Sequence, residues 1–422
     1  MDTHGRIIPN AHLPDDRKRI DWLSVLQLGS SALAMMGLWG LSLMTVFGFG
    51  MMLVEEGAGE TLGATIAGSA ALFFTGVLAL ISAGLAARRL IKPEADPWVL
   101  PEGVKRWMSA YRWAALLPVV WLAAVMLPEM GAAATLIFPL VNILGIGLPV
   151  WLAVSLAKRK LPAGSGQRQW GLFTSGMVFA TAPILILELL AGVFLVAAAI
   201  LLNPGLMQAL MGMLEGGNNI EIFELERLVS AHIEEADVLA FVGVYIAFLV
   251  PLIEELLKPI GVWLLAGRKL TPAAGFAAGA VSGAGFALFE SLLGSADPSL
   301  WPNALLARAG TAAMHTLASG ISGWGLAHAF TYKRYGRALL SYLAAVGLHA
   351  SWNAVPVIVG AAALAEEVNG STLDIGQLEG AAAGLFAIMG LAALALLVYI
   401  NRRLAGGAEA PTGDEATAEA AN

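Results

Sequence analysis

The sequence contains no cysteine and little charge. The absence of cysteine excludes a thiol nucleophile, a thiolate metal site and any disulfide. Charged residues make up only 13% of the chain, about half the share found in a soluble globular domain. The formal net charge of −7 offers no basic surface for a nucleic acid, so no nucleic-acid partner is expected.

The apolar content is high and arranged in long runs. Hydrophobic residues make up 58% of the chain, and the mean hydropathy is +0.74. Apolar runs of about 20 residues, long enough to cross a bilayer as helices, recur throughout. We therefore predict an all-α, polytopic transmembrane helical bundle in the cell membrane. The ten predicted spans are 25–54, 62–86, 112–128, 132–157, 171–203, 237–266, 272–293, 305–331, 338–362 and 376–400.

Lysine and arginine alternate from loop to loop, which predicts the orientation of the chain. Cationic loops tend to stay in the cytoplasm. Cations precede the first predicted span and follow the second, fourth, sixth, eighth and tenth, whereas the intervening loops carry mainly acids. The exceptions are Arg227, Lys258 and Arg308. Both termini are thus predicted to be cytoplasmic.

These patterns divide the chain into six predicted segments. They are a cytoplasmic segment 1–24, an N-terminal membrane domain 25–203 of about five helices, an extracytoplasmic acidic loop or amphipathic helix 204–236, a helical core 237–362, a last transmembrane helix 363–403, and a disordered acidic tail 404–422. No role for the N-terminal membrane domain follows from the sequence.

The stretch "PLIEELLKP", residues 251–259, puts three ionisable groups inside an apolar run. Glu254 and Lys258 are four residues apart, so they share a helical face and can pair, while Glu255 is turned about 100° from Glu254. The two prolines lack an N–H and free the carbonyls of Ala247 and Glu255. Freed backbone at membrane depth needs protein or a water-filled cavity, so we predict a wet pocket here. The structural alternative is an ion pair on a kinked helix.

The next three spans add further polar residues at similar depth. Glu290 follows Phe286 by one turn and has Arg308 as a candidate salt-bridge partner. His315 lies in the eighth span, and "HASWN" in the ninth carries His349 and Asn353. Counted at 1.5 Å per residue, most of this set falls at one level just outside the midplane, with Glu290 nearer the outer surface. Charges inside a bilayer are costly, so such a cluster marks a functional site. The first five spans hold a single acid of this kind, Glu188, for which structural and accessory roles both remain open.

Glutamates and histidines together are typical of a hydrolytic active site. Carboxylates and neutral imidazoles are zinc ligands, a glutamate beside a positioned water is a general base, and histidine or asparagine can donate to an oxyanion. A site of the same residues without a metal is equally compatible with the sequence. The chain has no HExxH and no GxGD motif. Ser282 and Ser319 lie in small-residue contexts similar to those of rhomboid nucleophiles, although helix packing is the commoner role of such serines.

The residues of spans six to nine resemble the PrsW family of intramembrane proteases. "EELLK", residues 254–258, resembles the EExxK motif of that family, and "FALFE", residues 286–290, resembles its FxxxE. His315 and His349 fall where the family has its own histidines. More distantly, the array is similar to the CAAX-protease-like superfamily: "HASWN" fits HxxxN, while Glu290 stands in place of the histidine of FxxxH. The resemblance covers roughly residues 237–360 and makes the core 237–362 a PrsW-like catalytic core.

The resemblance implies an intramembrane endopeptidase, a metallopeptidase with zinc as the candidate metal. It implies site-1-type cleavage of a membrane-anchored protein, such as an anti-sigma factor, near the outer face. Our hypothesis assigns seven site residues, with Glu254 or Glu255 as the base on water, Lys258 tuning the glutamates, Glu290, His315 and His349 as metal ligands, and Asn353 as a polar stabiliser. In the same hypothesis the histidines are alternatively oxyanion donors and Glu290 an orienting group. A proton- or cation-coupled transporter and an inactive membrane scaffold are the alternative functions.

Overall fold

The computed structural model describes residues 21–56, 61–92, 104, 109–130, 132–215, 235–295, 301–369 and 375–409. Nearly all of these residues are helical, and none of them forms a strand. The predicted all-α class is confirmed. The long apolar runs explain this, because a chain in hydrocarbon must satisfy its backbone hydrogen bonds within each segment.

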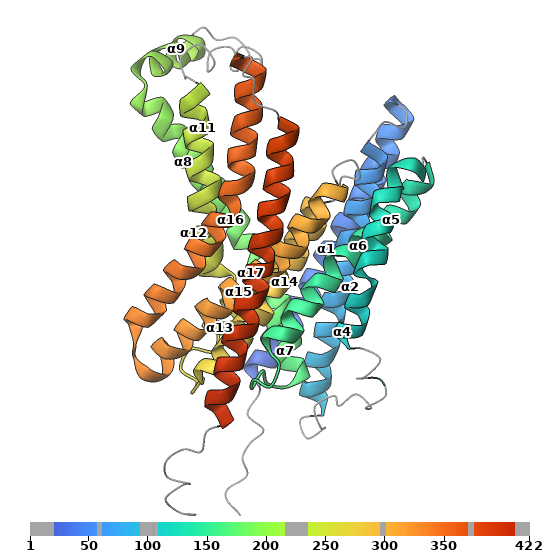
Figure 1. Ribbon diagram of the computed structural model, residues 1–422, viewed down its shortest axis with the longest axis vertical. Coiled ribbons are helices and arrows are strands. Elements are labelled where there is room, and N and C mark those ends of the chain that lie inside the picture. Colours follow the sequence, from blue (N-terminus) through green and yellow to red (C-terminus); the bar gives the residue numbers. More distant parts are fainter. Residues whose placement is uncertain are drawn as a thin grey trace, which may run out of the picture.

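Figure 1 shows the helices of the described residues in chain order. They are α1 (Trp22–Glu56), α2 (Thr61–Ile91), α4 (Ala110–Trp113), η1 (Ala114–Leu116), α5 (Leu117–Met126), η2 (Leu127–Met130), α6 (Ala132–Ala157), α7 (Gly166–Thr174), η3 (Ser175–Phe179), α8 (Thr181–Leu202), α9 (Pro204–Glu215), α11 (Glu235–Val244), η4 (Tyr245–Leu249), α12 (Val250–Leu257), α13 (Ile260–Trp263), α14 (Pro272–Gly294), α15 (Trp301–Tyr332), α16 (Tyr335–Asn369) and α17 (Ile375–Glu409). Elements η3 and η4 are single π-helical turns.

Eight helical segments in the described part of the chain are long and apolar enough to cross a membrane. The two remaining predicted spans also form helices. Residues 305–331 lie in α15, whose hydropathy is lower because it carries polar and small residues. Most of the span 112–128 lies in the shorter apolar stretch Ala110–Met126, and its last two residues begin η2. The total of ten spans therefore stays a prediction, whereas a multi-pass membrane protein is confirmed.

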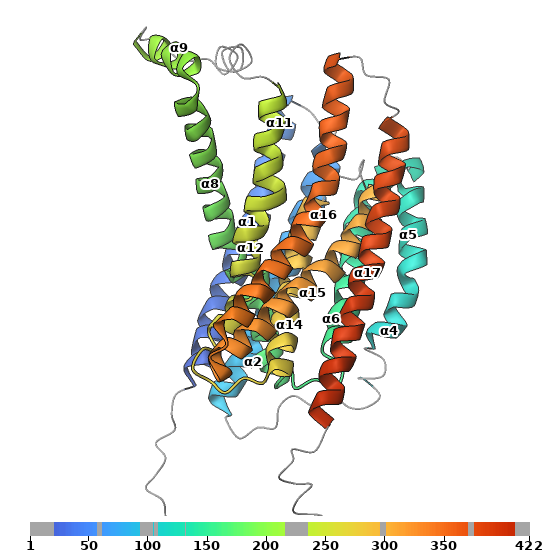
Figure 2. The ribbon, with the colours of Figure 1, turned by 60° about the vertical axis from the view of Figure 1, so that its left-hand side comes forward.

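Helix α14 lies at the centre of the bundle and is buried along most of its length. It packs most extensively against α15, while α1 and α2 form a pair that packs beside α6, α7 and α14. Figures 1 and 2 both show the start of α1 and the end of α17 at the same, lower end of the bundle, and α9 lying across the upper end of α8. Helix α1 thus begins and α17 ends on the same side of the bundle, while the assignment of that side to the cytoplasm stays a prediction. Most of the acidic segment predicted around 204–236 lies outside the described residues.

Three glycines of α14 allow α15 to approach closely. Gly275, Gly279 and Gly283 repeat every fourth residue, and a Cβ added at any of them would collide with α15. At Gly279 it would collide with the carbonyl oxygen of Ser319. In membranes, small residues in this spacing let two helices pack closely. The contact matters for the site because α15 carries His315.

The Gly279→Ala variant is expected to destabilise the protein by about 1–3 kcal/mol, because the added methyl group must push the two helices apart. Its control is Gly384→Ala in α17, where an added Cβ meets nothing within 4 Å. Thermal unfolding of the purified variants in detergent measures the difference. Equal midpoints for the two variants would contradict the tight α14–α15 contact.

Candidate active site

A π-helical turn precedes the helix that carries the paired glutamates. In η4 the N–H of Val250 donates to the carbonyl of Tyr245, five residues back. In this register Pro251, which has no N–H, lies opposite the carbonyl of Ile246 rather than that of Ala247. The side-chain amide of Asn353 on α16 donates to the Ile246 carbonyl at 3.0 Å. The freed carbonyl is therefore shifted by one residue from the predicted one and is satisfied by protein.

Other side chains fix the rest of α12. Ser282 of α14 donates to the carbonyl of Lys258 at 2.6 Å, and the Tyr342 hydroxyl of α16 donates to that of Leu252 at 2.7 Å. Ser282 therefore supports the backbone of the site. The indole N–H of Trp263 donates to the Leu256 carbonyl at 3.0 Å. These bonds hold α12 against two neighbouring helices, and the water-filled pocket beside it stays a prediction.

The Lys258 ammonium is the centre of the polar cluster. Its Nζ lies 2.7 Å from Glu254 Oε2 and 2.7 Å from Glu255 Oε1. The predicted Glu254–Lys258 pair is confirmed. Glu255 also reaches the lysine, since residues three apart on a helix are neighbours too. Lys258 and Glu255 are 0% exposed and Glu254 is 7% exposed, so water screens these charges little.

His315 connects this centre to Glu290. Its Nδ1 lies 2.6 Å from Lys258 Nζ, and its Nε2 lies 2.7 Å from Glu290 Oε2. An ammonium can only donate, so Nδ1 accepts from Lys258, and the carboxylate of Glu290 accepts a hydrogen bond from Nε2–H. The ring is therefore neutral, with the Nδ1 lone pair directed at the centre. Arg308 lies 3.2 Å from the other oxygen of Glu290, which is the salt bridge considered from the sequence.

His349 approaches the same centre from α16. Its Nδ1 lies 3.1 Å from Glu255 Oε1, 3.4 Å from Lys258 Nζ and 3.7 Å from Glu254 Oε2. Its ring packs edge-on against that of His315, with centroids 4.8 Å apart. Phe286, the first residue of the "FALFE" motif, contacts the ring of His315 edge-on, and the Lys258 ammonium lies 4.5 Å from the centroid of Phe286. Helices α12, α14, α15 and α16 thus each supply part of one cluster.

Four of these residues form a donor set for a metal ion. One ligand atom each from Glu254, Glu255, His315 and His349 lies within 4.8 Å of the other three, and all four residues are buried. Two carboxylates and two imidazoles suit zinc. Oε2 of Glu255 is buried without a hydrogen-bond partner, and the four donors already surround one cation, the ammonium. The donor set therefore fits a metal. Glu290 lies behind His315, on its far nitrogen.

All seven predicted site residues are described, and all but Asn353 are joined by the polar contacts of the cluster. Asn353 is one turn from His349, but its amide is bonded to Ile246. Tyr342 also contacts α12, although no sequence motif marks it; its spacing of seven residues from His349 puts both side chains on one face of α16. Glu188 of α8, noted as an isolated acid, interacts with Glu254 and so borders the cluster.

Comparison with known proteins agrees with this geometry. Residues 169–373 match the model of the PrsW family intramembrane metalloproteases. The chain has no significant match among the curated proteins and none among the solved structures. The match begins in α7, before the helices that carry the motifs, and ends after α16, so it includes α8 with Glu188. Residues 169–373 are thus similar to the PrsW family of intramembrane metalloproteases, and the buried Glu/His cluster lies inside this region.

Proposed function

We propose that the cluster hydrolyses a peptide bond in a membrane-anchored protein, of the kind represented by an anti-sigma factor, in a site-1-type cleavage. The observation that supports this is the meeting of two glutamates and two histidines in one buried cluster. Hydrolysis needs a base for water and a polarised carbonyl, and this set of groups can supply both.

We propose Glu254 or Glu255 as the general base. Oε1 of Glu255 is held by Lys258 and His349, while Oε2 has no hydrogen-bond partner and is free to accept a proton from water. The single Lys258 ammonium contacts both carboxylates and offsets part of their negative charge. The ammonium therefore keeps the Glu255 carboxylate charged and able to accept a proton in a buried position, where an unpaired carboxylate would raise the free energy of the folded state.

Glu290 acts in this proposal by orienting His315. Its carboxylate accepts from Nε2 and leaves Nδ1 as the acceptor that faces the cluster. A carboxylate on the far nitrogen of a histidine commonly fixes the tautomer and the ring orientation. Asn353 in turn keeps η4 and α16 together, which sets the distance between His349 and the glutamates.

The Glu290→Gln variant is expected to lower the cleavage rate about 10- to 100-fold, because the amide can present its own N–H to Nε2 and invert the tautomer. Single-turnover cleavage measures the rate. The matched control is Glu379→Gln, which changes an exposed glutamate of α17. A rate equal to that of the control would show that Glu290 does not orient His315.

Glu254, Glu255, His315 and His349 would hold the metal of this family. When zinc is bound, it supplies a Lewis acid at the scissile carbonyl and favours deprotonation of water. We expect about one zinc per chain in the purified wild type and a loss of that zinc in a His315→Ala, His349→Ala double variant. Elemental analysis of the purified protein measures this. Equal zinc in both proteins would place the metal elsewhere.

Comparative proteomics of membranes tests the proposed substrate class. Cells with the Glu254→Gln variant are expected to accumulate an intact membrane-anchored protein that cells with the wild type cleave, because the change removes one of the two candidate bases from the cluster. The Glu379→Gln variant serves again as the control. If no membrane protein were stabilised by Glu254→Gln relative to this control, the proposed substrate class would be wrong.

A further inference from the structure

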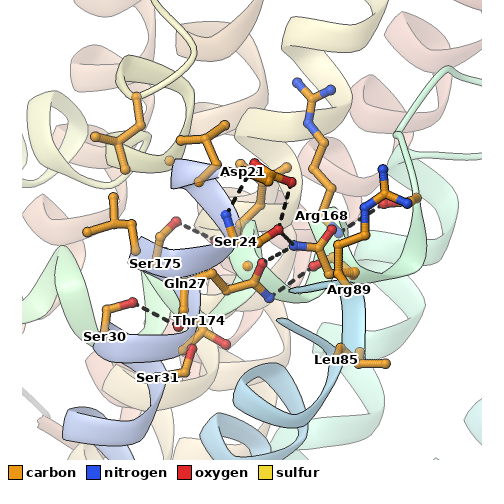
Figure 3. Close-up of a pocket in the computed structure, with 18 of the residues that line it drawn as sticks. Asp21, Ser24, Gln27, Ser30, Ser31, Leu85, Arg89, Arg168, Thr174 and Ser175 are labelled. Carbon is orange, nitrogen blue, oxygen red and sulfur yellow. Dashed lines mark hydrogen bonds between the residues drawn. The ribbon is translucent and has the colours of Figure 1, made fainter. Parts of the chain in front are cut away.

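A second polar site lies at the end of the bundle where the chain begins, away from the Glu/His cluster. Residues from the start of α1, the end of α2, α7 and the α13 region enclose a cavity of about 630 Å³ (Figure 3). Pockets for small ligands usually have volumes of about 300–1,000 Å³. We call this cavity the α1–α7 pocket. None of the residues of the Glu/His cluster lines it.

The lining of the α1–α7 pocket is strongly cationic. Its basic residues are Arg88, Arg89, Lys92, Arg168 and Arg268, against a single acid, Asp21. The carboxylate of Asp21 caps the first turn of α1, where it accepts from the hydroxyl and the N–H of Ser24. The excess of positive charge favours the binding of an anionic ligand.

Arg168 carries a donor that no described residue satisfies. Its Nε is buried and has no hydrogen-bond partner among the described residues, although a buried donor normally has an acceptor. Arg168 and Arg268 are also close enough to repel each other electrostatically. An anion with several acceptor oxygens would satisfy the donor and relieve the repulsion, and a phosphate group has this property.

The pocket wall is already organised without a ligand. Gln27 donates to Ser82 and to the carbonyl of Gln167, and Gln167 donates to Ser24 and to Gln27. Figure 3 shows these α1 groups beside Arg168 of α7. Because these side chains are already held in place, little further conformational entropy is lost when a ligand binds.

Apolar side chains complete the pocket. Leu172 and Leu265 are buried in its lining, while Leu26 and Leu264 in the same lining are about half exposed, on a helical bundle whose outer surface meets lipid. A ligand that fits both parts carries an anionic phosphate and a hydrocarbon chain. We propose that the α1–α7 pocket binds the phosphate headgroup of an anionic phospholipid from the leaflet at this end, which the loop charges predict to be the cytoplasmic one.

Native mass spectrometry of the full-length protein tests this proposal. The purified chain is exchanged into detergent with phosphatidylglycerol, with phosphatidylcholine or with inorganic phosphate. The wild type is expected to retain one phosphatidylglycerol in preference to phosphatidylcholine. The Arg168→Gln, Arg268→Gln double variant should bind it more weakly, by roughly fivefold for each cation removed.

Two further variants make the result decisive. The double variant Arg88→Gln, Lys92→Gln changes two exposed cations of the pocket, so it should fold normally. It should nevertheless bind the anionic lipid more weakly than the wild type does. Arg402→Gln removes an exposed cation of α17 that does not line the pocket, and it should bind lipid as the wild type does. Equal lipid retention by all the variants would overturn the proposal. If the protein retained inorganic phosphate but showed no preference for phosphatidylglycerol, the proposal that the ligand is a lipid would be wrong.

Discussion

Replacing Glu255 with glutamine should abolish most of the cleavage, with an expected loss of about 10²- to 10⁴-fold in rate. Glutamine has the same shape but cannot take a proton from water. It also loses the negative charge that Lys258 and His349 contact through Oε1. Single-turnover cleavage of a transmembrane substrate in liposomes measures the effect.

The loss must come from chemistry and not from folding. Glu255→Gln keeps a side chain of equal size in a fully buried position, so the purified variant should insert into membranes and migrate as the wild type does. Glu379→Gln removes a charge without touching the site and should cleave at the wild-type rate. If Glu255→Gln retained more than about a tenth of that rate, Glu255 could not be the general base.

Replacing Lys258 with methionine should have the largest effect on stability, about 3–5 kcal/mol. Without the ammonium, the carboxylates of Glu254 and Glu255 are left buried together with no cation between them. The control is Lys269→Met, which changes an exposed lysine and should alter stability by less than about 0.5 kcal/mol. Thermal unfolding in detergent measures both variants.

A double variant shows whether this loss comes from the charge cluster. Combining Lys258→Met with Glu255→Gln removes one uncompensated carboxylate, so the double variant should be more stable than Lys258→Met alone. Residues in one ion-pair network commonly show coupling energies of about 0.5–3 kcal/mol. If the stability loss of the double variant equalled the sum of the losses in Lys258→Met and Glu255→Gln, the contact between Lys258 and Glu255 would be contradicted.

Much of the site could be predicted from the sequence because the membrane makes its signals strong. A glutamate or histidine inside a 20-residue apolar run is costly, so Glu254, Glu255, His315 and His349 are conspicuous. Equal depth on successive helices then suggested that they meet. The glycine repeat of α14 is also visible in the sequence, and such a repeat indicates a close helix contact because the missing side chains allow the approach.

Other features depend on contacts that no local pattern records. The π-turn η4 shifts the carbonyl opposite Pro251 from Ala247 to Ile246. The prediction assumed a regular α-helix, so it could not include this shift. The helical spacing predicted a pair between Glu254 and Lys258 only, yet the long side chain of Lys258 also reaches Glu255. Depth counting put Glu290 nearer the outer surface, whereas its side chain reaches His315 on the next helix. The α1–α7 pocket needs residues from four distant segments, so it became visible only in the fold.

Cleavage of a single-span substrate by the purified chain in liposomes tests the central claim most directly. Five proteins are compared: the wild type, Glu255→Gln, His349→Ala, Ser282→Ala and Ser319→Ala. If the Glu/His cluster is the catalytic centre, the wild type and both serine variants cleave, while Glu255→Gln and His349→Ala do not. Undiminished cleavage by Glu255→Gln and His349→Ala would contradict the assignment of this cluster as the active site.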